Sequence, residues 1–362
     1  MKKSLPVNEI IHSECIAAME KMPDESIDLI FADPPYNLQI DKKLKRPDES
    51  KVEGVHEKWD SFESFAHYDE FTEKWLSQAR RILKKNGAIW TMGSYHNIFR
   101  VGNIMQNLGF WILNDVIWLK SNPMPNFRGT RFTNAHETLI WAGRDKNARP
   151  CFQYHAMKAL NEGVQMRSDW VLPLCIGGER LKNEKGDKLH PTQKPEALLY
   201  RVLLASSKKG DVVLDPFAGT ATSCAVAKKL GRNFIGIEAH GEYVQHAKAR
   251  LAESKPLSEE ALAVTLSPRA EPRIAFGALV ERGIVKPGTQ LFGPARKYGA
   301  KVRADGSLKA QDKTGSIHKM GALLQGREAC NGWKFWHIAS GGRLVPIDDL
   351  RAVLRLEMVR TR

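Results

Sequence analysis

Apolar and polar residues alternate with two different periods along the first 250 residues of the chain. Short runs rich in Ile, Val, Leu, Phe and Trp predict strands at 27–33, 87–93, 111–119, 137–142, 211–215 and 233–238. Apolar residues three and four positions apart predict helices at 65–83, 196–206, 222–230 and 241–252. Strands that alternate with helices in this way predict an α/β fold built on a doubly wound sheet.

Two stretches, 38–60 and 120–190, interrupt this alternation. Both are polar, basic in places and short of a strand pattern. Insertions of this length in a compact domain are usually functional or mobile. One begins just after the strand at 27–33 and the other just after the strand at 111–119, so by position both would flank a ligand bound at these strand ends. A solvated run of charges fits their basic clusters about equally well.

A change in composition marks the end of the first domain. Residues 254–268 are polar and contain Pro256 and Pro268, which is typical of a linker between domains. The sequence therefore predicts a first domain at 1–253 and a second domain at 269–362.

The second domain is expected to be a small α+β unit. Residues 277–288 predict a short helix followed by glycine, and 289–292 and 300–303 predict short strands joined by turns. Trp333 and Trp336 lie beside basic residues, a pattern that suits both a nucleic-acid surface and the core of a small domain.

The strand at 27–33 ends in Asp33-Pro34-Pro35-Tyr36, which suits an exocyclic base amine. The lone pair of such an amine is delocalised into the ring, so it attacks well only when acceptors bind its hydrogens. The Asp33 carboxylate and the Pro34 carbonyl are candidate acceptors on a stiff backbone without N–H donors. The Tyr36 ring can stack an extruded base, an interaction of ~1–3 kcal/mol. An ordinary proline-rich turn is the alternative.

A second motif, residues 212–220, places a small-residue turn between a strand and a helix. Such a turn approaches a nucleotide-like ligand at the carboxyl end of a parallel strand. The strand at 233–238 ends in Glu238, where an acid hydrogen-bonds ribose hydroxyls in Rossmann-like folds. A dehydrogenase would carry G-x-G-x-x-G here, and residues 218–223 do not. The motif therefore favours an adenosyl donor over a nicotinamide dinucleotide.

In this order the two motifs resemble those of S-adenosylmethionine-dependent amino-methyltransferases, and in particular the β group of DNA adenine-N6 methyltransferases. Further stretches are similar to the cell-cycle-regulated CcrM type, and the resemblance covers nearly the whole chain. These stretches are 93–100, 120–127, 190–195, 315–319 and 331–333.

The resemblance implies a Rossmann-like methyltransferase sheet with permuted motif order and a C-terminal DNA-binding domain. It implies that a methyl group passes from S-adenosylmethionine to adenine N6 in duplex DNA, at GANTC, by base flipping. It also implies a link to DNA replication and the cell cycle, and a homodimer as an expected assembly. A solitary enzyme and the modification half of a restriction system remain open alternatives.

Catalytic and donor-binding residues follow from the motifs and the resemblance. The catalytic set is Asp33, Pro34, Pro35 and Tyr36. The donor is expected to contact Asp33, His190, Thr192, Gln193, Lys194, Asp215, Phe217, Gly219, Thr220 and Glu238. Residues 190–195 precede the start of a helix, which favours an anion such as the donor's carboxylate.

The turn at residues 217–221, called the donor turn below, departs from the family pattern at one position. Such enzymes usually carry Phe-x-Gly-x-Gly, and this chain has Ala221 in place of the second glycine. If the position needs a positive φ or a close backbone approach, the Cβ costs donor affinity, by ~1 kcal/mol.

A formal net charge of +14 and a pI near 9.5 are typical of a protein that meets polyanions. Residues 251–362 contain 19 Lys and Arg against 11 Asp and Glu, so +8 of the +14 lies there. This favours a DNA-contacting C-terminal domain, because phosphate contacts supply most non-specific affinity. The expected DNA-binding residues are Arg46, Lys120, Asn122, Arg128, Arg131, Ser316, His318, Lys319, Asn331 and Trp333.

Other reactions differ in the target atom. Cytosine-N4 transfer often uses Ser-Pro-Pro-Tyr and protein-glutamine methylation Asn-Pro-Pro-Tyr, so Asp33 favours adenine. Cytosine-C5 chemistry needs a thiol, usually in Pro-Cys; Pro150-Cys151 follows a basic loop without strand context and is taken as coincidence. A DNA-binding protein with weakened catalysis is the remaining alternative, supported by Ala221 alone.

Length and composition agree with a cored, two-domain protein of 362 residues with 42% hydrophobic content. No apolar run approaches 18 residues and no signal peptide is visible, so we expect a cytoplasmic, nucleoid-associated protein without membrane contact. Five scattered cysteines without C-x-x-C argue against a disulfide framework and a zinc site, and no metal is expected.

Overall fold

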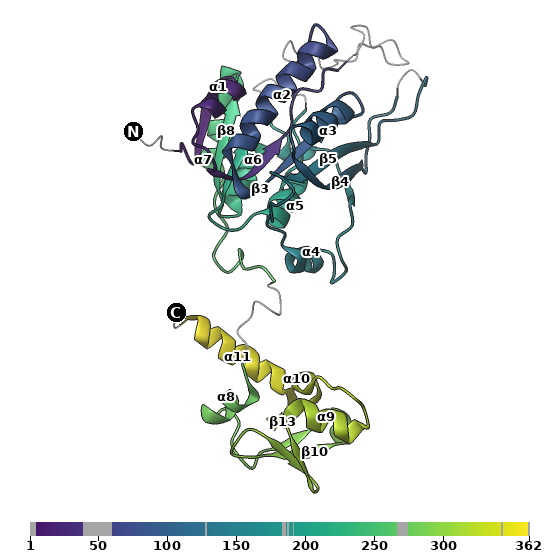
Figure 1. Ribbon diagram of the computed structural model, residues 1–362, viewed down its shortest axis with the longest axis vertical. Helices are drawn as coiled ribbons and strands as arrows, with labels where there is room; N and C mark the ends of the chain where they lie inside the picture. The colour runs from purple at the N-terminus through teal and green to yellow at the C-terminus, as the bar shows by residue number, and fades with distance from the viewer. Residues whose placement is uncertain are drawn as a thin grey trace. The chain divides into compact units, whose positions relative to one another are not determined.

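The structure is a computed structural model. It describes residues 5–38, 60–126, 129–182, 186, 188–190, 192–265, 274–341 and 343–360, with side chains as far as Arg355. The chain divides into two compact units, Met1–Thr265 and Leu266–Arg362 (Figure 1). Each unit has its own sheet and its own hydrophobic core, so each is described by itself.

The first unit contains an eight-stranded sheet in the order β1-β8-β7-β2-β3-β5-β4-β6. Its strands are β1 (Glu9–His12), β2 (Ile27–Ala32), β3 (Leu83–Gly93), β4 (Trp111–Lys120), β5 (His136–Gly143), β6 (Asp169–Leu172), β7 (Val212–Asp215) and β8 (Asn233–Glu238). Its helices are α1 (Cys15–Glu20), α2 (Phe65–Ile82), α3 (Ile98–Asn107), α4 (Tyr154–Leu160), α5 (Glu196–Ser206), α6 (Thr222–Lys229) and α7 (Gly241–Glu253), with the short 3-10 turn η2 (Gly177–Glu179).

Strand direction determines where the functional residues gather. The pairs β1/β8, β8/β7, β7/β2, β2/β3 and β4/β6 are parallel, while β5 pairs antiparallel with both β3 and β4. Within the described sheet, only β5 runs opposite to the rest. Its amino end therefore lies at the same edge as the carboxyl ends of the other strands.

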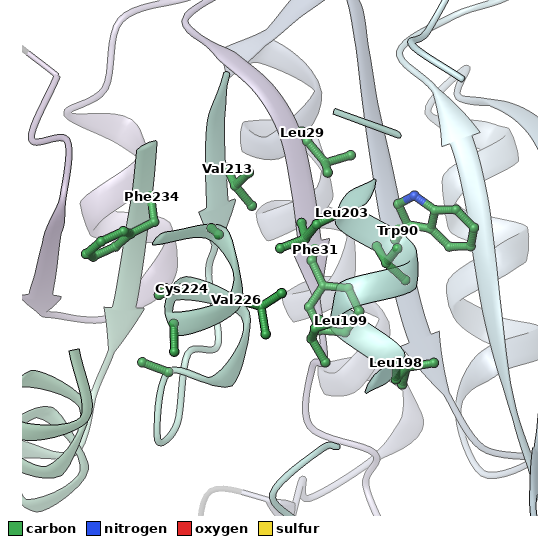
Figure 2. Close-up of a cluster of buried hydrophobic side chains, with 14 of the residues drawn as sticks. Leu29, Phe31, Trp90, Leu198, Leu199, Leu203, Val213, Cys224, Val226 and Phe234 are labelled. Atoms are coloured by element: carbon green, nitrogen blue, oxygen red, sulfur yellow. The ribbon is translucent and has the colours of Figure 1, made fainter. Parts of the chain in front are cut away.

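Apolar side chains cover both faces of this sheet, as a doubly wound fold requires. On one face, Leu29, Phe31 and Trp90 pack with residues of α5 and α6 such as Leu199 and Val226 (Figure 2). The other face carries a second cluster that includes residues of α1, α2 and α3. Strand β2 reads Ile-Asp-Leu-Ile-Phe-Ala, the near-continuous apolar run typical of a parallel strand buried on both faces.

The six strands predicted for this unit are all present, and so are the four predicted helices. The doubly wound α/β prediction is confirmed. Strands β1 and β6 were not predicted. Each has four residues, and they form the two ends of the strand order, where one neighbour suffices and the apolar pattern is short. Much of the stretch 120–190 is regular, because it contains β5, α4 and β6.

Residues 254–265, predicted as part of a linker, pack on the first unit. The Leu257 N–H donates to the Lys229 carbonyl at 2.9 Å, and Leu262 packs against the sheet's core. The structural boundary therefore follows Thr265, later than the predicted end of the first domain at 253.

The second unit contains a six-stranded antiparallel sheet in the order β12-β11-β10-β9-β13-β14. Its core includes both Trp333 and Trp336. The elements are α8 (Phe276–Glu281), β9 (Gln290–Phe292), η3 (Pro294–Arg296), β10 (Gly299–Val302), β11 (Leu308–Ala310), β12 (Lys313–Gly315), α9 (Ile317–Gln325), α10 (Gly332–Phe335), β13 (His337–Ser340), β14 (Arg343–Pro346) and α11 (Ile347–Arg360). In the described part of either unit, no helix is both long and apolar enough to cross a bilayer.

Candidate active site at the carboxyl edge of the sheet

The two sequence motifs meet because β2 and β7 are neighbours in the sheet. Leu29 pairs with Val213 and Ile30 with Leu214, so Asp33 and Asp215 leave adjacent parallel strands at the same edge. The chain order reverses here: β2 is followed by β3 on one side, and β7 lies on the other. Ligands of open α/β sheets bind at such a switch point.

A cavity of about 350 Å³ opens at this edge. Phe62, Phe71, Phe217, Ile237 and Tyr243 give it an apolar lining. This size and mixed lining suit a small-molecule site. The predicted donor-binding residues that line it are Asp33, His190, Thr192, Lys194, Phe217, Gly219 and Glu238.

Three predicted donor-binding residues do not line this cavity: Gln193, Asp215 and Thr220. The Gln193 amide accepts from the Leu181 N–H at 3.0 Å and donates to the Glu179 carbonyl at 2.9 Å, so it fastens the loop before α5. The start of α5 is also occupied, because the Glu196 N–H donates to the Glu179 carboxylate. Binding of the donor's anionic end at that helix terminus stays a prediction.

Glu238 fixes the donor turn to the end of β8. Its carboxylate accepts from the Gly219 N–H at 2.8 Å and from the His240 N–H at 2.8 Å. Gly219 has φ +51°, and a Cβ there would lie 3.2 Å from His190 Nε2. Glycine is therefore favoured at this position, both by the left-handed backbone and by the close contact with His190.

His190 is a neutral group against this turn. Burial, together with the nearby charges of Lys194 and Arg180, lowers the pKa of its imidazole to about 4. Its Nδ1 accepts from the Thr192 N–H at 3.2 Å, so in the neutral ring the proton is on Nε2. His190 therefore presents an N–H donor, without charge, near Gly219.

Asp215 has an unusual carboxyl group. Its oxygens accept from the Phe217 N–H at 3.0 Å and from the Ser223 hydroxyl. Burial raises the pKa of this carboxyl to about 7, against the hydrogen bonds that favour its ionised form. Asp215 thus supports the donor turn from behind the cavity and changes charge near neutral pH.

A buried cluster of charges lies around the first motif. Lys194 Nζ is 2.6 Å from Asp33 Oδ2, and Lys120 Nζ is 2.7 Å from Glu137 Oε1. The Tyr36 hydroxyl lies between the two carboxylates, 2.9 Å from Asp33 Oδ1 and 2.9 Å from Glu137 Oε2. Lys194 Nζ is also 4.0 Å from Glu137 and lies over the Tyr36 ring.

The pKa directions in this cluster follow from burial and from ion pairing. Burial raises the pKa of Asp33 despite its Lys194 partner, and burial with two adjacent carboxylates raises the pKa of Tyr36 well above its usual value. Burial alone would raise the pKa of Glu137, but Lys194 and Lys120 outweigh it and lower that pKa. Burial alone would lower the pKa of Lys194, and Asp33 and Glu137 raise it instead.

The backbone of the first motif is held by residues that the sequence did not point to. The Asp60 carboxylate accepts from the N–H groups of Tyr36 at 2.5 Å, of Asn37 at 2.9 Å and of Leu38 at 3.4 Å. The Tyr68 hydroxyl donates to the Pro35 carbonyl at 2.9 Å. In the described part of the chain, the Pro34 carbonyl has no hydrogen-bond partner.

Asp60, Tyr68 and Glu137 were missed for different reasons. Glu137 had a signal, a charged residue at the start of an apolar strand. Tyr68 occupies an apolar position of α2, where the sequence pattern indicates packing alone. Asp60 is the last residue of the 38–60 insertion, and its contacts with Tyr36 arise from tertiary structure that no local pattern encodes.

The predicted DNA-binding residues of the first unit have mixed environments. Lys120 is ion-paired with Glu137 and is 10% exposed, so its charge is directed inward. The Asn122 side chain accepts from the Leu174 N–H at 2.9 Å, and Arg131 donates to the exposed Tyr95 hydroxyl at 2.7 Å. Arg46 and Arg128 lie outside the described residues.

In the second unit, the predicted residues cluster at the starts of two helices. Ser316 caps α9 by accepting from the Lys319 N–H at 3.2 Å, and Asn331 caps α10 by accepting from the Trp333 N–H at 3.2 Å. His318 Nδ1 is 3.0 Å from the Gly332 N–H. Trp333 is buried, with the Arg351 guanidinium over its ring.

Asp60→Asn tests how the motif loop is held. An amide has one acceptor oxygen and no charge, so the N–H groups of residues 36–38 lose charge-assisted hydrogen bonds. We expect the free energy of unfolding of the variant to fall by about 1–3 kcal/mol. Urea denaturation measures it, with the exposed Asp115→Asn as the matched control. Equal stability of the two variants would show that Asp60 does not hold the loop.

Asp215→Asn tests the raised carboxyl pKa. Between pH 4 and pH 7 the folded state holds one more proton at Asp215 than the unfolded state, because the pKa rises from 3.8 to about 7 on folding. This group therefore makes stability fall as pH rises through that window, by up to ~1.4 kcal/mol per pH unit. Urea midpoints at several pH values should show a flatter profile for the variant. Parallel profiles would contradict an elevated pKa.

Comparisons with known proteins agree with this geometry. A family described as DNA methylase matches residues 27–249, and a family described as Restriction Enzyme Adenine Methylase Associated matches residues 256–360. The Type II methyltransferase M.HinfI of Haemophilus influenzae is 48% identical over 95% of this chain and 96% of its own length. The Type II methyltransferase M2.DpnII of Streptococcus pneumoniae is 45% identical over 67% of this chain and 88% of its own length.

Solved structures share the fold of the first unit. The M1.HpyAVI–SAM complex superposes with a TM-score of 0.50 at 26% identity, covering 67% of this chain and 98% of its own. The PvuII DNA methyltransferase (cytosine-N4-specific) has a TM-score of 0.54 at 19% identity, covering 70% of this chain and 89% of its own. This likeness shows the fold alone. The chain therefore belongs to the DNA methylase family, as an adenine-specific DNA methyltransferase with the class I fold of S-adenosylmethionine-dependent methyltransferases.

Proposed function

We propose that the protein transfers a methyl group from S-adenosylmethionine to N6 of an adenine flipped out of duplex DNA, at GANTC. The observation that carries the proposal is the shared cavity. Asp33 and Tyr36 line it together with Gly219 and Glu238, from strands that are neighbours in the sheet. The amine's acceptors and the donor's site are then adjacent, and proximity and orientation supply much of the rate.

The residues of the cavity fit the donor. Glu238 is fixed by two backbone N–H groups and keeps acceptor capacity for ribose hydroxyls. Phe217, Ile237 and Tyr243 supply apolar surface, and Gly219 lets the backbone approach closely. Bound there, S-adenosylmethionine would supply an electrophilic methyl group on a sulfonium. M1.HpyAVI, whose solved complex contains this molecule, has a similar fold.

The chain's own part in transfer is to orient the amine. Asp33 can accept one of its hydrogens and the Pro34 carbonyl another, while Tyr68 and Asp60 hold the backbone that follows that carbonyl. Attack of the amine on the methyl group needs no covalent intermediate with the protein. After transfer, the amine carries an extra proton, which passes to the Asp33 carboxylate or to water.

Two features support adenine over cytosine-N4 as the target. The motif begins with Asp33, and the C-terminal match is to segments associated with adenine methylases. The GANTC site, the CcrM-type link to the cell cycle and the homodimer rest on resemblance alone. DNA contact by Arg46, Lys120, Asn122, Arg128, Arg131, Ser316, His318, Lys319, Asn331 and Trp333 likewise stays a proposal.

The first experiment incubates the purified chain with unmethylated plasmid and S-adenosylmethionine. Single-molecule sequencing then maps modified bases, and mass spectrometry of nucleosides identifies them. N6-methyladenine at GANTC is the expected product. N4-methylcytosine would establish the alternative reaction, N6-methyladenine at another sequence would overturn only the site, and no methylation with DNA binding intact would favour a weakened enzyme.

Asp33→Ala tests the catalytic assignment. Without the carboxylate the amine loses an acceptor and Lys194 loses its partner, so we expect the methylation rate at saturating DNA and donor to fall by at least ~100-fold. DNA affinity, measured by anisotropy, should stay near that of the parent. Asp24→Ala, at an exposed ion pair with Arg81, is the control and should keep the parent rate. A parent-like rate for the Asp33 variant would refute the assignment.

Ala221→Gly tests the one departure in the donor turn. Ala221 does have a left-handed backbone, with φ +58°, but it is fully buried in the sheet's core and does not line the cavity. Relief of left-handed strain, ~1–2 kcal/mol, is offset by glycine's added flexibility, ~0.5–1 kcal/mol, and by the lost methyl burial, ~0.8 kcal/mol. We expect stability to change by less than about 1 kcal/mol, and calorimetry to give a donor affinity within about twofold of the parent. A much tighter donor complex would show that Ala221 weakens binding.

A further inference from the structure

Glu137 is a buried carboxylate that none of the motifs accounts for. It is the second residue of β5, the strand that runs against the others in the described sheet, and it pairs in register with Trp118 of β4. This reversal brings its side chain to the carboxyl edge beside Asp33 and Tyr36. It contacts Tyr36 but does not line the cavity, so it lies behind the reacting groups.

Burial makes Glu137 costly to keep for stability alone. Its side chain is 12% exposed and that of its partner Lys120 is 10% exposed. Desolvating two such ions often costs as much as their attraction returns, and apolar residues of similar size are frequently as stable. A buried ion pair beside catalytic groups therefore points to a role in their geometry.

The hydrogen-bond count around Tyr36 indicates that role. Its hydroxyl has one hydrogen and two carboxylate oxygens at the same 2.9 Å, one on Asp33 and one on Glu137. Asp33 already accepts from Lys194 at 2.6 Å through its other oxygen. A hydroxyl hydrogen directed at Asp33 competes with an incoming amine for the lone pairs of that oxygen, whereas one directed at Glu137 leaves both lone pairs available to the amine.

We propose that Glu137 is a positioning residue that accepts the Tyr36 hydroxyl hydrogen and so leaves Asp33 able to accept from the target amine. Lys120 holds Glu137 in place as its counter-ion. This inference rests on the proposed adenine-N6 function of the same site. It gives Lys120 a task inside the protein, in addition to the proposed contact with DNA.

Glu137→Gln reverses the hydrogen bond without removing bulk. The amide has a single oxygen, which Lys120 takes, and its NH₂ group then donates to the Tyr36 oxygen. The hydroxyl hydrogen is thereby directed at Asp33. We expect the single-turnover methylation rate, at saturating DNA and donor, to fall at least ~tenfold, with the dissociation constants for both ligands within about twofold of the parent.

A double-mutant cycle with Tyr36→Phe separates this role from a merely structural one. Phenylalanine keeps the ring and removes the hydroxyl, so Glu137 no longer accepts a hydrogen bond from residue 36. In the Tyr36→Phe background, Glu137→Gln is expected to change the rate by less than about twofold. The same loss in both backgrounds would mean that Glu137 acts through charge or folding, and would overturn the proposal.

Glu137→Asp is a second variant that separates loss of the Tyr36 hydrogen bond from loss of charge or of folding. It keeps the negative charge for Lys120 but withdraws the oxygen from Tyr36, so it should slow transfer in the parent background and have little effect in the Tyr36→Phe background. Glu25→Gln, at the ion pair with Arg144, is the matched control and should keep the parent rate. Parent-like rates for both Glu137 variants would overturn the proposal. An inactive parent enzyme would count instead against the proposed function.

Discussion

The ion pair between Asp33 and Lys194 is the interaction on which the rest of the site depends. It joins residues 161 positions apart, one after β2 and the other just before α5, inside a cavity wall where each ion alone would be costly. Once Lys194 is held there, the preceding loop is fixed as well. His190 then lies against Gly219, and that contact ties the loop to the donor turn.

The sheet makes this pairing possible through two features of its topology. The reversal of chain order at β2 and β7 brings the motifs to neighbouring strands, and the opposite direction of β5 adds Glu137 from an amino end. Carboxylates from three separate strands, with Glu238 at the end of β8, thereby lie along one edge. Lys194 and Lys120 balance the charges of Asp33 and Glu137, and backbone N–H groups bind Glu238.

The sequence predicts what depends on local periodicity and misses what depends on side chains meeting across the fold. The apolar runs of β2, β7 and β8 are long enough to identify, and the fold brings the residues that end them to one edge. Asp60 could not be found this way, because its carboxylate accepts from three backbone N–H groups that come together only when the loop is folded. Gln193 shows the other side of this limit: it belongs to a recognisable motif, and only the fold shows that both of its amide atoms bond to the backbone of its own loop.

The first motif, residues 33–36, combines a backbone held by hydrogen bonds with one hydrogen that can move, that of the Tyr36 hydroxyl. Asp60 and Tyr68 fix the chain at Pro35 and Tyr36, directly after the Pro34 carbonyl. Moving a buried ion in response to an incoming base would require desolvated charges to separate, whereas rotating the Tyr36 hydroxyl from one carboxylate to the other moves a single hydrogen between oxygens at equal distance. Electrostatic preorganisation is effective when little has to reorganise during reaction. In this site, rotation of one hydroxyl group, that of Tyr36, is the only adjustment that this mechanism requires of the described side chains.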